Sequence, residues 1–360
     1  MPSLATSKDK RFYWFRMARR SSRSKKKRSL WGSLLLLATG ALAALTVVAW
    51  WLISSPFGPE GETFVQFAPG SSSMHIAAQL EQAGIVRSQY AFDLIRLLQR
   101  GRLQAGEYRF THPASVSEVY RRIVRGDVYT RPLTVPEGAN IYDIAARVEQ
   151  SHLASGADFL EAARQTDLVA DLDPQARTLE GYLFPDTYRF AHNTTAPQMV
   201  AAMVHRFRQA AADAGIVRNF HATVTLASIV ERETAVASER PLVASVFANR
   251  LDRNMPLATD PSVIYGLLTQ NRWAGVIHRS DLAYDTPYNT YLHAGLPPGP
   301  IANPGLPSLQ AAAHPAQTNY LYFVASGTDA QGHSRFAATL DEHNHNVAGY
   351  RRAQKKAGLR

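Results

Sequence analysis

The chain has 360 residues, a net charge of +10 and no cysteine, and 46% of its residues are hydrophobic. This length suits a membrane anchor and about two domains, and the absence of cysteine excludes a disulfide framework and a thiol nucleophile. Residues 1–29 hold eleven of the 39 Lys/Arg but one of the 29 Asp/Glu, which leaves 28 basic and 28 acidic residues for the remainder. Because the body of the chain has no excess of positive charge to neutralise phosphates, it is not expected to bind nucleic acid.

An uncharged apolar segment, Leu30–Ile53, follows the basic tail. As a helix it would span roughly 36 Å, more than a bilayer core of about 30 Å. Tryptophans stand at both ends, as in the aromatic belts of membrane proteins (Trp31, Trp50 and Trp51). We therefore expect a cytoplasmic tail at 1–29 and a transmembrane helix at 30–53, with the body on the outer side. The alternative is a cleaved signal peptide, because Ala41-Leu42-Ala43 resembles a cleavage site, although the apolar run continues past it.

A small α+β module is expected after the anchor. Residues 54–61 are rich in Ser, Pro and Gly and indicate a linker. Within residues 62–175, two similar segments at 64–84 and 133–148 each predict a strand, a Pro/Gly turn and an amphipathic helix. The second, beginning Val-Pro-Glu-Gly, resembles the first half of a LysM glycan-binding module. The module would grip amino-sugar chains or, alternatively, serve as a structural spacer.

Residues 176–360 predict a mainly helical domain with loops rich in Pro, Gly, Asn and Tyr. Helices are expected at about 196–212 and 224–236, and a third from about Ser238 forms a hairpin with the second. Residues 320–325 predict a core strand. Three constrained polar and aromatic segments would line a cleft suited to sugars, at 258–266, 286–291 and 295–305.

The predicted helix at 224–236 carries two carboxylates, Glu231 and Glu233, which point in different directions because they are two residues apart. The positions three, four and seven residues from Glu233 are the more apolar set, namely Leu226, Ile229, Val230, Val236, Ala237 and Arg240. Burial raises a carboxyl pKa, and a carboxyl protonated near neutral pH can act as a general acid. The alternatives are Glu231 as the acid, or two exposed glutamates with Glu233 reaching Arg240.

Six motifs occur in order along the C-terminal half, at residues 227–240, 259–266, 288–291, 295–301, 311–315 and 320–325. Together with the anchor and the module, they resemble the endolytic murein transglycosylase family (YceG-like). The resemblance implies an α+β fold with a single N-terminal transmembrane helix, a LysM-like module and a mainly helical catalytic domain whose lysozyme-like helix carries the acid. It implies a lyase of the bacterial inner membrane with its catalytic domain in the periplasm.

In this family the substrate would be the peptidoglycan glycan strand. The enzyme would cut the MurNAc-GlcNAc bond internally, leave 1,6-anhydroMurNAc ends and terminate nascent strands, with peptidoglycan synthases as partners. No cofactor and no metal are expected. The alternatives are a muramidase-type hydrolase of the same bond and a non-catalytic glycan-binding scaffold.

The Glu233-Thr234 pair matches the Glu-Ser/Thr signature of lytic transglycosylases, which implies Glu233 as the catalytic acid and keeps Glu231 as the fallback. Substrate contacts are expected from Glu180, Thr259, Asp260, Tyr288 and Asn289. One position departs from the family pattern, since Ala258 stands where a Gln is expected before Thr-Asp-Pro.

Overall fold

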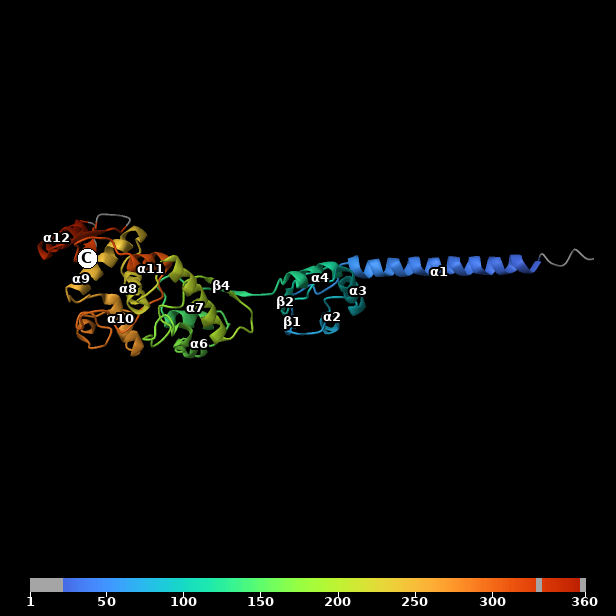
Figure 1. The fold of residues 1–360 in the computed structure, drawn as a ribbon, viewed down its shortest axis with the longest axis horizontal. Coiled ribbons are helices and arrows are strands. Elements are labelled where there is room, and N and C mark those ends of the chain that lie inside the picture. The colour runs from blue at the N-terminus through green and yellow to red at the C-terminus, as the bar shows by residue number, and fades with distance from the viewer. Residues whose placement is uncertain (1–21, 328–331, 357–360) are drawn as a thin grey trace, which may run out of the picture. The chain divides into compact units, whose positions relative to one another are not determined.

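The structure, a computed structural model, describes residues 22–327 and 332–356, with side chains from Trp31 to Lys355. It contains helices and small two-stranded sheets, as expected, in two compact units that meet between Tyr129 and Thr130 (Figure 1). Most of the basic tail expected at residues 1–29 lies outside the described residues.

One helix in the described part of the chain is long and apolar enough to cross a membrane. Helix α1 (Ser22–Ser54) contains the apolar stretch Trp31–Ser54, whose mean hydropathy is 2.1 and whose most apolar 18 residues are not buried. This confirms the apolar helix expected at 30–53. Its length and composition fit a single-pass anchor and a signal sequence alike.

The remainder of the N-terminal unit is a compact α+β module. Its elements are β1 (Thr63–Phe67), α2 (Ser73–Gln82), α3 (Gln89–Gln99), β2 (Gly106–Phe110) and α4 (Val116–Arg125). Strands β1 and β2 pair antiparallel, from Thr63 opposite Phe110 to Phe67 opposite Gly106. Alternate residues of both strands are buried, as strand geometry requires. The hydroxyls of Ser72 and Ser115 cap α2 and α4 by accepting N–H bonds from the first turns.

The C-terminal unit holds the larger core and all remaining elements. These are β3 (Arg131–Thr134), α5 (Ile141–Gln150), α6 (Gly156–Ala162), η1 (Thr166–Val169), β4 (Thr187–Phe190), α7 (Ala196–Asp213), α8 (Phe220–Glu233), η2 (Ala237–Glu239), α9 (Arg240–Asp252), α10 (Asp260–Thr269), η3 (Asp281–Ala283), α11 (Leu306–Ala313), β5 (Tyr322–Ala325), β6 (Ser334–Ala337) and α12 (Leu340–Lys356).

The unit boundary differs from the expected domain boundary at 175/176. Strand β3 pairs with β4, from Arg131 opposite Phe190 to Thr134 opposite Thr187. A single core runs from Leu133 to Ala312. The second strand–turn–helix segment therefore belongs to the C-terminal unit, because its apolar faces are buried there and not against β1 and β2. The division into a LysM-like module and a catalytic domain stays a prediction.

Helix α8 is the central helix of the C-terminal unit. Every residue from Val224 to Val230 is buried, which explains its apolar character on all sides. It packs against α9, α10 and α11 (Figure 1). The chain turns sharply after Glu233, where Thr234 is extended and its hydroxyl accepts a bond from Val236 N–H. The predicted helical hairpin is confirmed.

Two predicted elements differ from those observed. Residues 260–266, expected within a loop, belong to helix α10 (Asp260–Thr269), which has Thr259 as its N-cap and Pro261 in its first turn. The expected core strand at 320–325 is β5 in a two-stranded sheet with β6, and its residues are only partly buried. Both errors have one cause, which is that the composition of a segment does not show which other segments pack against it.

Gly181 tests the packing around α8. Its φ is +87°, and a Cβ there would lie 2.6 Å from Pro300 Cβ and 2.8 Å from Val224 Cγ1. We expect Gly181→Ala to lower the free energy of unfolding by about 3 kcal/mol through backbone strain and overpacking. The matched control is Gly295→Ala, because Gly295 has φ +91° and no atom within 4 Å of a new Cβ. The control should cost about 1 kcal/mol from strain alone. Equal losses in urea denaturation would contradict the packing described.

Candidate active site

Glu233 is the last residue of α8 and is partly exposed. Because the helix ends there, Val236, Ala237 and Arg240 are not its helical neighbours, which corrects the expected set. The upstream neighbours, among them Ile229 and Val230, are buried as expected. The carboxyl therefore stands at the edge of the core, at the negative end of the helix dipole, where a charged carboxylate is disfavoured.

Burial raises the pKa of Glu233 to about 7, and the nearby charge of Asp260 acts in the same direction. A hydrogen bond with the Thr259 hydroxyl and the charge of Arg250 oppose this shift. A carboxyl with this pKa is about half protonated near neutral pH, so it can both give and take a proton. This agrees with the direction expected from the sequence.

Two of the predicted polar segments meet beside Glu233. Thr290 accepts a bond from Ala258 N–H through its carbonyl (3.0 Å) and from Thr259 N–H through its hydroxyl (3.0 Å). That hydroxyl also lies 2.8 Å from Ser262 Oγ. Tyr291 donates its O–H to Asp260 Oδ1 (2.7 Å). The structure thus brings Thr259 and Asp260 to the acid and adds Thr290 and Tyr291, which the sequence analysis did not single out.

Arg250 is another residue that sequence reasoning missed. It lies in the last turn of α9, donates from Nε to Leu321 O (2.7 Å) and from Nη1 to Leu257 O (2.8 Å), and faces Tyr322. Burial lowers its pKa. A basic residue at a helix C-terminus ordinarily needs no functional explanation, so no sequence signal marked it.

Ala258, the departure from the family pattern, adopts a left-handed conformation with φ +49°. This conformation is uncommon for a residue with a Cβ and costs of order 1 kcal/mol. It turns the chain from Leu257, held by Arg250, to Thr259, which faces Glu233. The strained position therefore lies directly beside the acid.

Glu231, the fallback acid, is held in a buried ion pair. Its side chain is 5% exposed; Oε1 accepts from Arg240 Nη2 (2.9 Å) and Oε2 accepts from Gly305 N–H (3.0 Å). The alternative in which Glu233 reaches Arg240 is therefore wrong. Since both oxygens of Glu231 are engaged, it ties the end of α8 to the start of α9.

The other three predicted contact residues have partners other than Glu233. Glu180 is buried, and its carboxyl accepts bonds from Ile141 N–H (3.0 Å) and Asn303 Nδ2 (2.8 Å); burial raises its pKa to about 8. Tyr288 packs edge-on against Tyr265, at 5.0 Å between ring centres. Buried Asn289 donates to two backbone carbonyls of its own loop. In this structure Glu180 and Asn289 are sealed from solvent and organise the loops.

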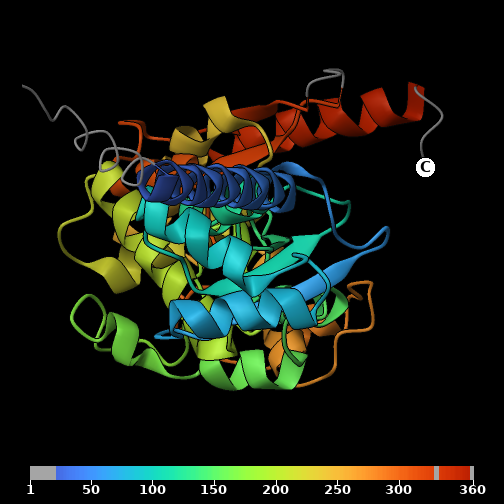
Figure 2. The ribbon, with the colours of Figure 1, turned by 90° about the vertical axis from the view of Figure 1, so that its right-hand side faces the viewer.

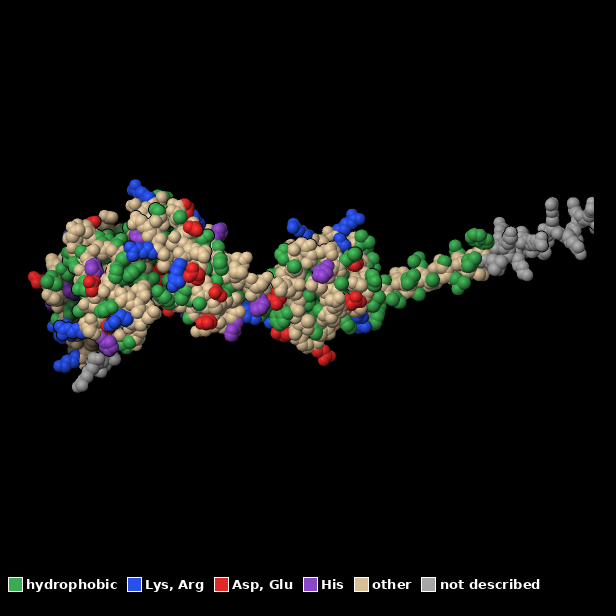
Figure 3. Space-filling view, turned by 90° about the horizontal axis from the view of Figure 1, so that it is seen from below, with side chains coloured by type: hydrophobic (Ala, Val, Ile, Leu, Met, Phe, Trp, Pro, Cys, Tyr) green, Lys and Arg blue, Asp and Glu red, His purple; other side chains and the backbone are tan. Residues whose placement is uncertain are grey.

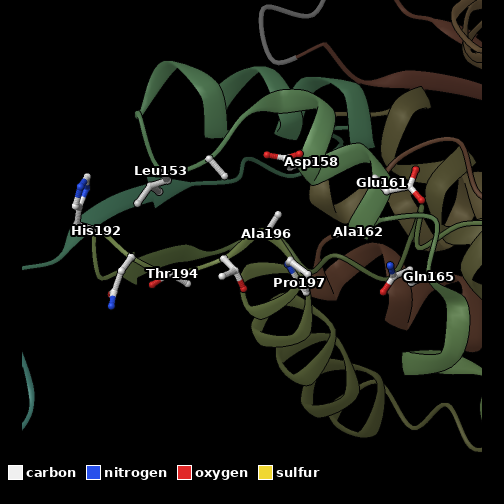
Figure 4. Close-up of a pocket in the computed structure, with 12 residues that line it drawn as sticks. Leu153, Asp158, Glu161, Ala162, Gln165, His192, Thr194, Ala196 and Pro197 are labelled. Carbon is white, nitrogen blue, oxygen red and sulfur yellow. The ribbon is translucent and has the colours of Figure 1, made fainter. Parts of the chain in front are cut away.

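A surface pocket of about 540 Å³ lies elsewhere in the C-terminal unit, between the turn before α6 and the start of α7 (Figure 4). Asp158 and Glu161 line one side, and His192 and Thr194 line the other (Figure 4). None of the predicted site residues lines it, so pocket size alone does not lead to Glu233.

Three features characterise this protein. A membrane-length helix precedes an α+β body, a partly buried glutamate ends the central helix of that body, and two polar segments joined by hydrogen bonds lie beside this glutamate. The model of the YceG-like family matches residues 65–349, and the chain belongs to that family.

Named relatives agree with this assignment. The chain is 32% identical over 302 residues to the endolytic murein transglycosylase of Bacillus subtilis, covering 78% of this chain and 82% of the relative. A Streptococcus pneumoniae endolytic murein transglycosylase is also 32% identical, over 318 residues, with 78% of this chain and 56% of the relative covered. The crystal structure of a YceG-like protein from Listeria monocytogenes matches with a TM-score of 0.51 and 29% identity, covering 80% of this chain and 99% of that one.

The ion pair of Glu231 makes a stability prediction. Glu231→Gln would leave the Arg240 guanidinium, 7% exposed, without its closest counter-charge. Breaking a buried pair this way should cost about 3 kcal/mol in the free energy of unfolding. The control is Glu161→Gln, whose pair with Arg164 is about two-thirds exposed, and it should change stability by less than about 1 kcal/mol. A loss for Glu231→Gln no larger than for the control would contradict the buried pair.

The raised pKa of Glu233 predicts how stability depends on pH. The folded chain holds this proton up to about pH 7, whereas the unfolded chain releases it near the ordinary value of 4.5. Stability is therefore lost as pH rises from about 4.5 through 7. Glu233→Gln removes this loss, so at pH 8 the variant should be about 3 kcal/mol more stable relative to wild type than it is at pH 4. Glu180 titrates in wild type and in Glu233→Gln alike, so its contribution to the pH dependence cancels in the comparison. Parallel curves from thermal unfolding across this range would contradict the assignment.

Proposed function

We propose that this chain is a peptidoglycan lytic transglycosylase that uses Glu233 as its single acid and base. The observation that carries the proposal is a partly exposed carboxyl with a pKa of about 7, beside polar loops that can hold a sugar. The names of the relatives supply the substrate class, murein glycan strands. Asp260 and Tyr291 are the proposed substrate-facing partners, whereas buried Thr259 acts through its hydrogen bond to Glu233.

The reaction balances without water or cofactor. Protonated Glu233 donates its proton to the oxygen linking MurNAc C1 to GlcNAc C4, and the C1–O bond breaks. The GlcNAc chain leaves with a free 4-hydroxyl. The Glu233 carboxylate then takes the proton of the MurNAc 6-hydroxyl as that oxygen bonds to C1. The product is a 1,6-anhydroMurNAc end, and Glu233 is again protonated.

This step needs one titrating carboxyl, whereas ordinary glycosidases use two. Asp260 raises the proton affinity of Glu233, and Arg250 stabilises its carboxylate after proton donation. Because these two charges oppose each other, the pKa of Glu233 stays near neutral pH, where the carboxyl can first donate a proton and then accept one. Tyr291 holds Asp260 through its O–H, which fixes the distance between the two carboxyls.

The membrane topology belongs to the same proposal. Helix α1 would remain as a single-pass anchor of the inner membrane, with the basic tail in the cytoplasm and the chain after α1 in the periplasm. Termination of nascent strands, peptidoglycan synthases as partners and glycan binding by a LysM-like module are further proposals from family resemblance.

Product mass tests the chemistry. Glycan strands incubated with wild type should yield fragments lighter by one water than hydrolysis products, because no water is added. Glu233→Gln should fold and lose cleavage by at least about a thousandfold, since the proton donor is gone. The matched control Glu161→Gln should cleave like wild type. Hydrated ends from wild type would favour the muramidase alternative, and retained anhydro ends from Glu233→Gln would reject Glu233 as the acid.

The pH dependence of cleavage tests the same carboxyl independently. The acid must be protonated for the first step, so kcat should be high below pH 7 and fall about tenfold per pH unit above it. Replacing Asp260 by Asn removes the charge that raises the pKa of Glu233, so the fall should begin at lower pH. An unchanged profile in Asp260→Asn would contradict the proposed coupling.

A further inference from the structure

Helix α3 carries two apolar faces, and only one of them packs in the core. Ala91, Phe92 and Ile95 are buried in the core of the N-terminal unit. The second face is a stripe in which Tyr90 is 75%, Leu94 38%, Leu97 65% and Leu98 70% exposed. These four residues follow helical spacing and cover about 100° of the helix surface. Within the described residues nothing covers this stripe.

The stripe belongs to a helix that packs against the end of α1. Leu52 and Ile53, in the last turn of α1, pack against the core of the N-terminal unit, and α1 contacts α3 and α4. The Arg87 guanidinium, two residues before α3, lies over the rings of Trp51 (4.6 Å) and Phe57 (4.9 Å).

The segment expected as a linker, 54–61, is tied down. Phe57 and Ala114 exchange two backbone hydrogen bonds of 3.0 Å, so the chain cannot swing freely between α1 and the module. The module therefore begins within one turn of Trp50 and Trp51, the expected membrane-surface residues. There is no spacer to lift α3 away from that surface.

The figures agree with this placement. In Figure 1, α3 lies at the end of its unit from which α1 emerges. Figure 2 is seen from the side on which α1 emerges and shows α1, in dark blue, in front of the cyan helices of its unit. Figure 3 shows hydrophobic side chains on this end of the unit, beside the apolar helix.

The charges around the stripe suit a lipid headgroup region. Residues 87–102 contain four arginines and one acid, Asp93. Arg96 and Arg100 lie on the polar side of α3, and Arg102 follows directly. Amphipathic helices that lie in a membrane interface combine an apolar face with such basic flanks.

We propose that the exposed stripe of α3, Tyr90–Leu94–Leu97–Leu98, inserts into the outer leaflet of the membrane that α1 crosses. This inference rests on the membrane anchor proposed above. The occupant of the stripe is the phospholipid bilayer, because the surface is continuous with the anchor and basic at its edges. Docking would fix the orientation of the α+β module relative to the membrane, so that the module does not rotate freely about α1.

The test uses the full chain in lipid nanodiscs that hold one copy each. Because the chain has no cysteine, a single introduced cysteine carries a polarity-sensitive fluorophore at a known site. The variants are Leu97→Cys in the stripe, Val217→Cys, 84% exposed in the C-terminal unit, and Leu42→Cys within α1. Quenching is measured with spin-labelled phospholipid and with aqueous iodide, and glycan cleavage by each variant is assayed in parallel.

The expected result is that the Leu97→Cys label is quenched by the lipid probe and protected from iodide, while the Val217→Cys label shows the reverse. If Leu42→Cys is quenched by lipid but Leu97→Cys behaves like Val217→Cys, the docking inference is overturned and the anchor stands. If Leu42→Cys is not quenched by lipid, both the proposed membrane anchor and the docking inference that rests on it are overturned. Cleavage reports on the proposed chemistry separately.

A second measurement identifies the stripe as the cause. The label at Tyr90→Cys should lose most of its lipid quenching when Leu97→Glu and Leu98→Glu are added, because two carboxylates cannot enter the acyl region. Unchanged lipid quenching would overturn the proposal. Protection from iodide that appears only in discs holding two copies, without lipid quenching, would assign the stripe to a second copy of this chain and overturn it too.

Discussion

The chemistry that we propose depends on the partial burial of one carboxyl at the end of helix α8, in which every residue from Val224 to Val230 is buried. Because the middle of helix α8 is buried in the core, its last residue, Glu233, lies at the edge of the core with only part of its surface exposed to water. Partial desolvation raises the pKa of Glu233 to about 7, and Asp260 adds to it. Neither effect would operate on an exposed surface helix.

Neighbouring parts of the structure hold that carboxyl in place by different means. The Glu231–Arg240 pair joins the end of α8 to α9 across the turn, and Gly305 N–H binds the second oxygen. Arg250 holds the backbone before the strained Ala258, and Thr290 ties that strand of chain to the neighbouring loop. Glu180 does equivalent work deeper in the core, where Asn303 and Ile141 share its carboxyl. Four acidic residues of similar appearance in the sequence thus have different tasks, since Asp260 tunes the acid, Glu231 and Glu180 join elements, and Glu233 reacts in our proposal.

The N-terminal unit is built for a fixed relation to α1. Its core accepts the last turn of α1 directly, and the short connection is closed by paired backbone bonds. A flexible tether would need neither the packing of the last turn of α1 nor the paired backbone hydrogen bonds. The exposed stripe on α3 then has a physical explanation, because an apolar surface of that kind is unfavourable in water and favourable at a bilayer surface.

By itself the sequence determined the features that depend on local pattern. These are the membrane-length helix, the helices α2, α5, α7, α8 and α9, the hairpin after Glu233 and the direction of its pKa. Periodicity and capping are properties of neighbouring residues, so they can be read without the fold. The tertiary structure alone decided which carboxylate pairs with Arg240, that Glu180 and Asn289 are sealed inside, that residues 130–175 join the C-terminal unit, and that Arg250, Thr290 and Tyr291 surround the acid. Each of these depends on contacts between segments far apart in the chain, and burial at such contacts is set by the whole packed core, which no local pattern contains.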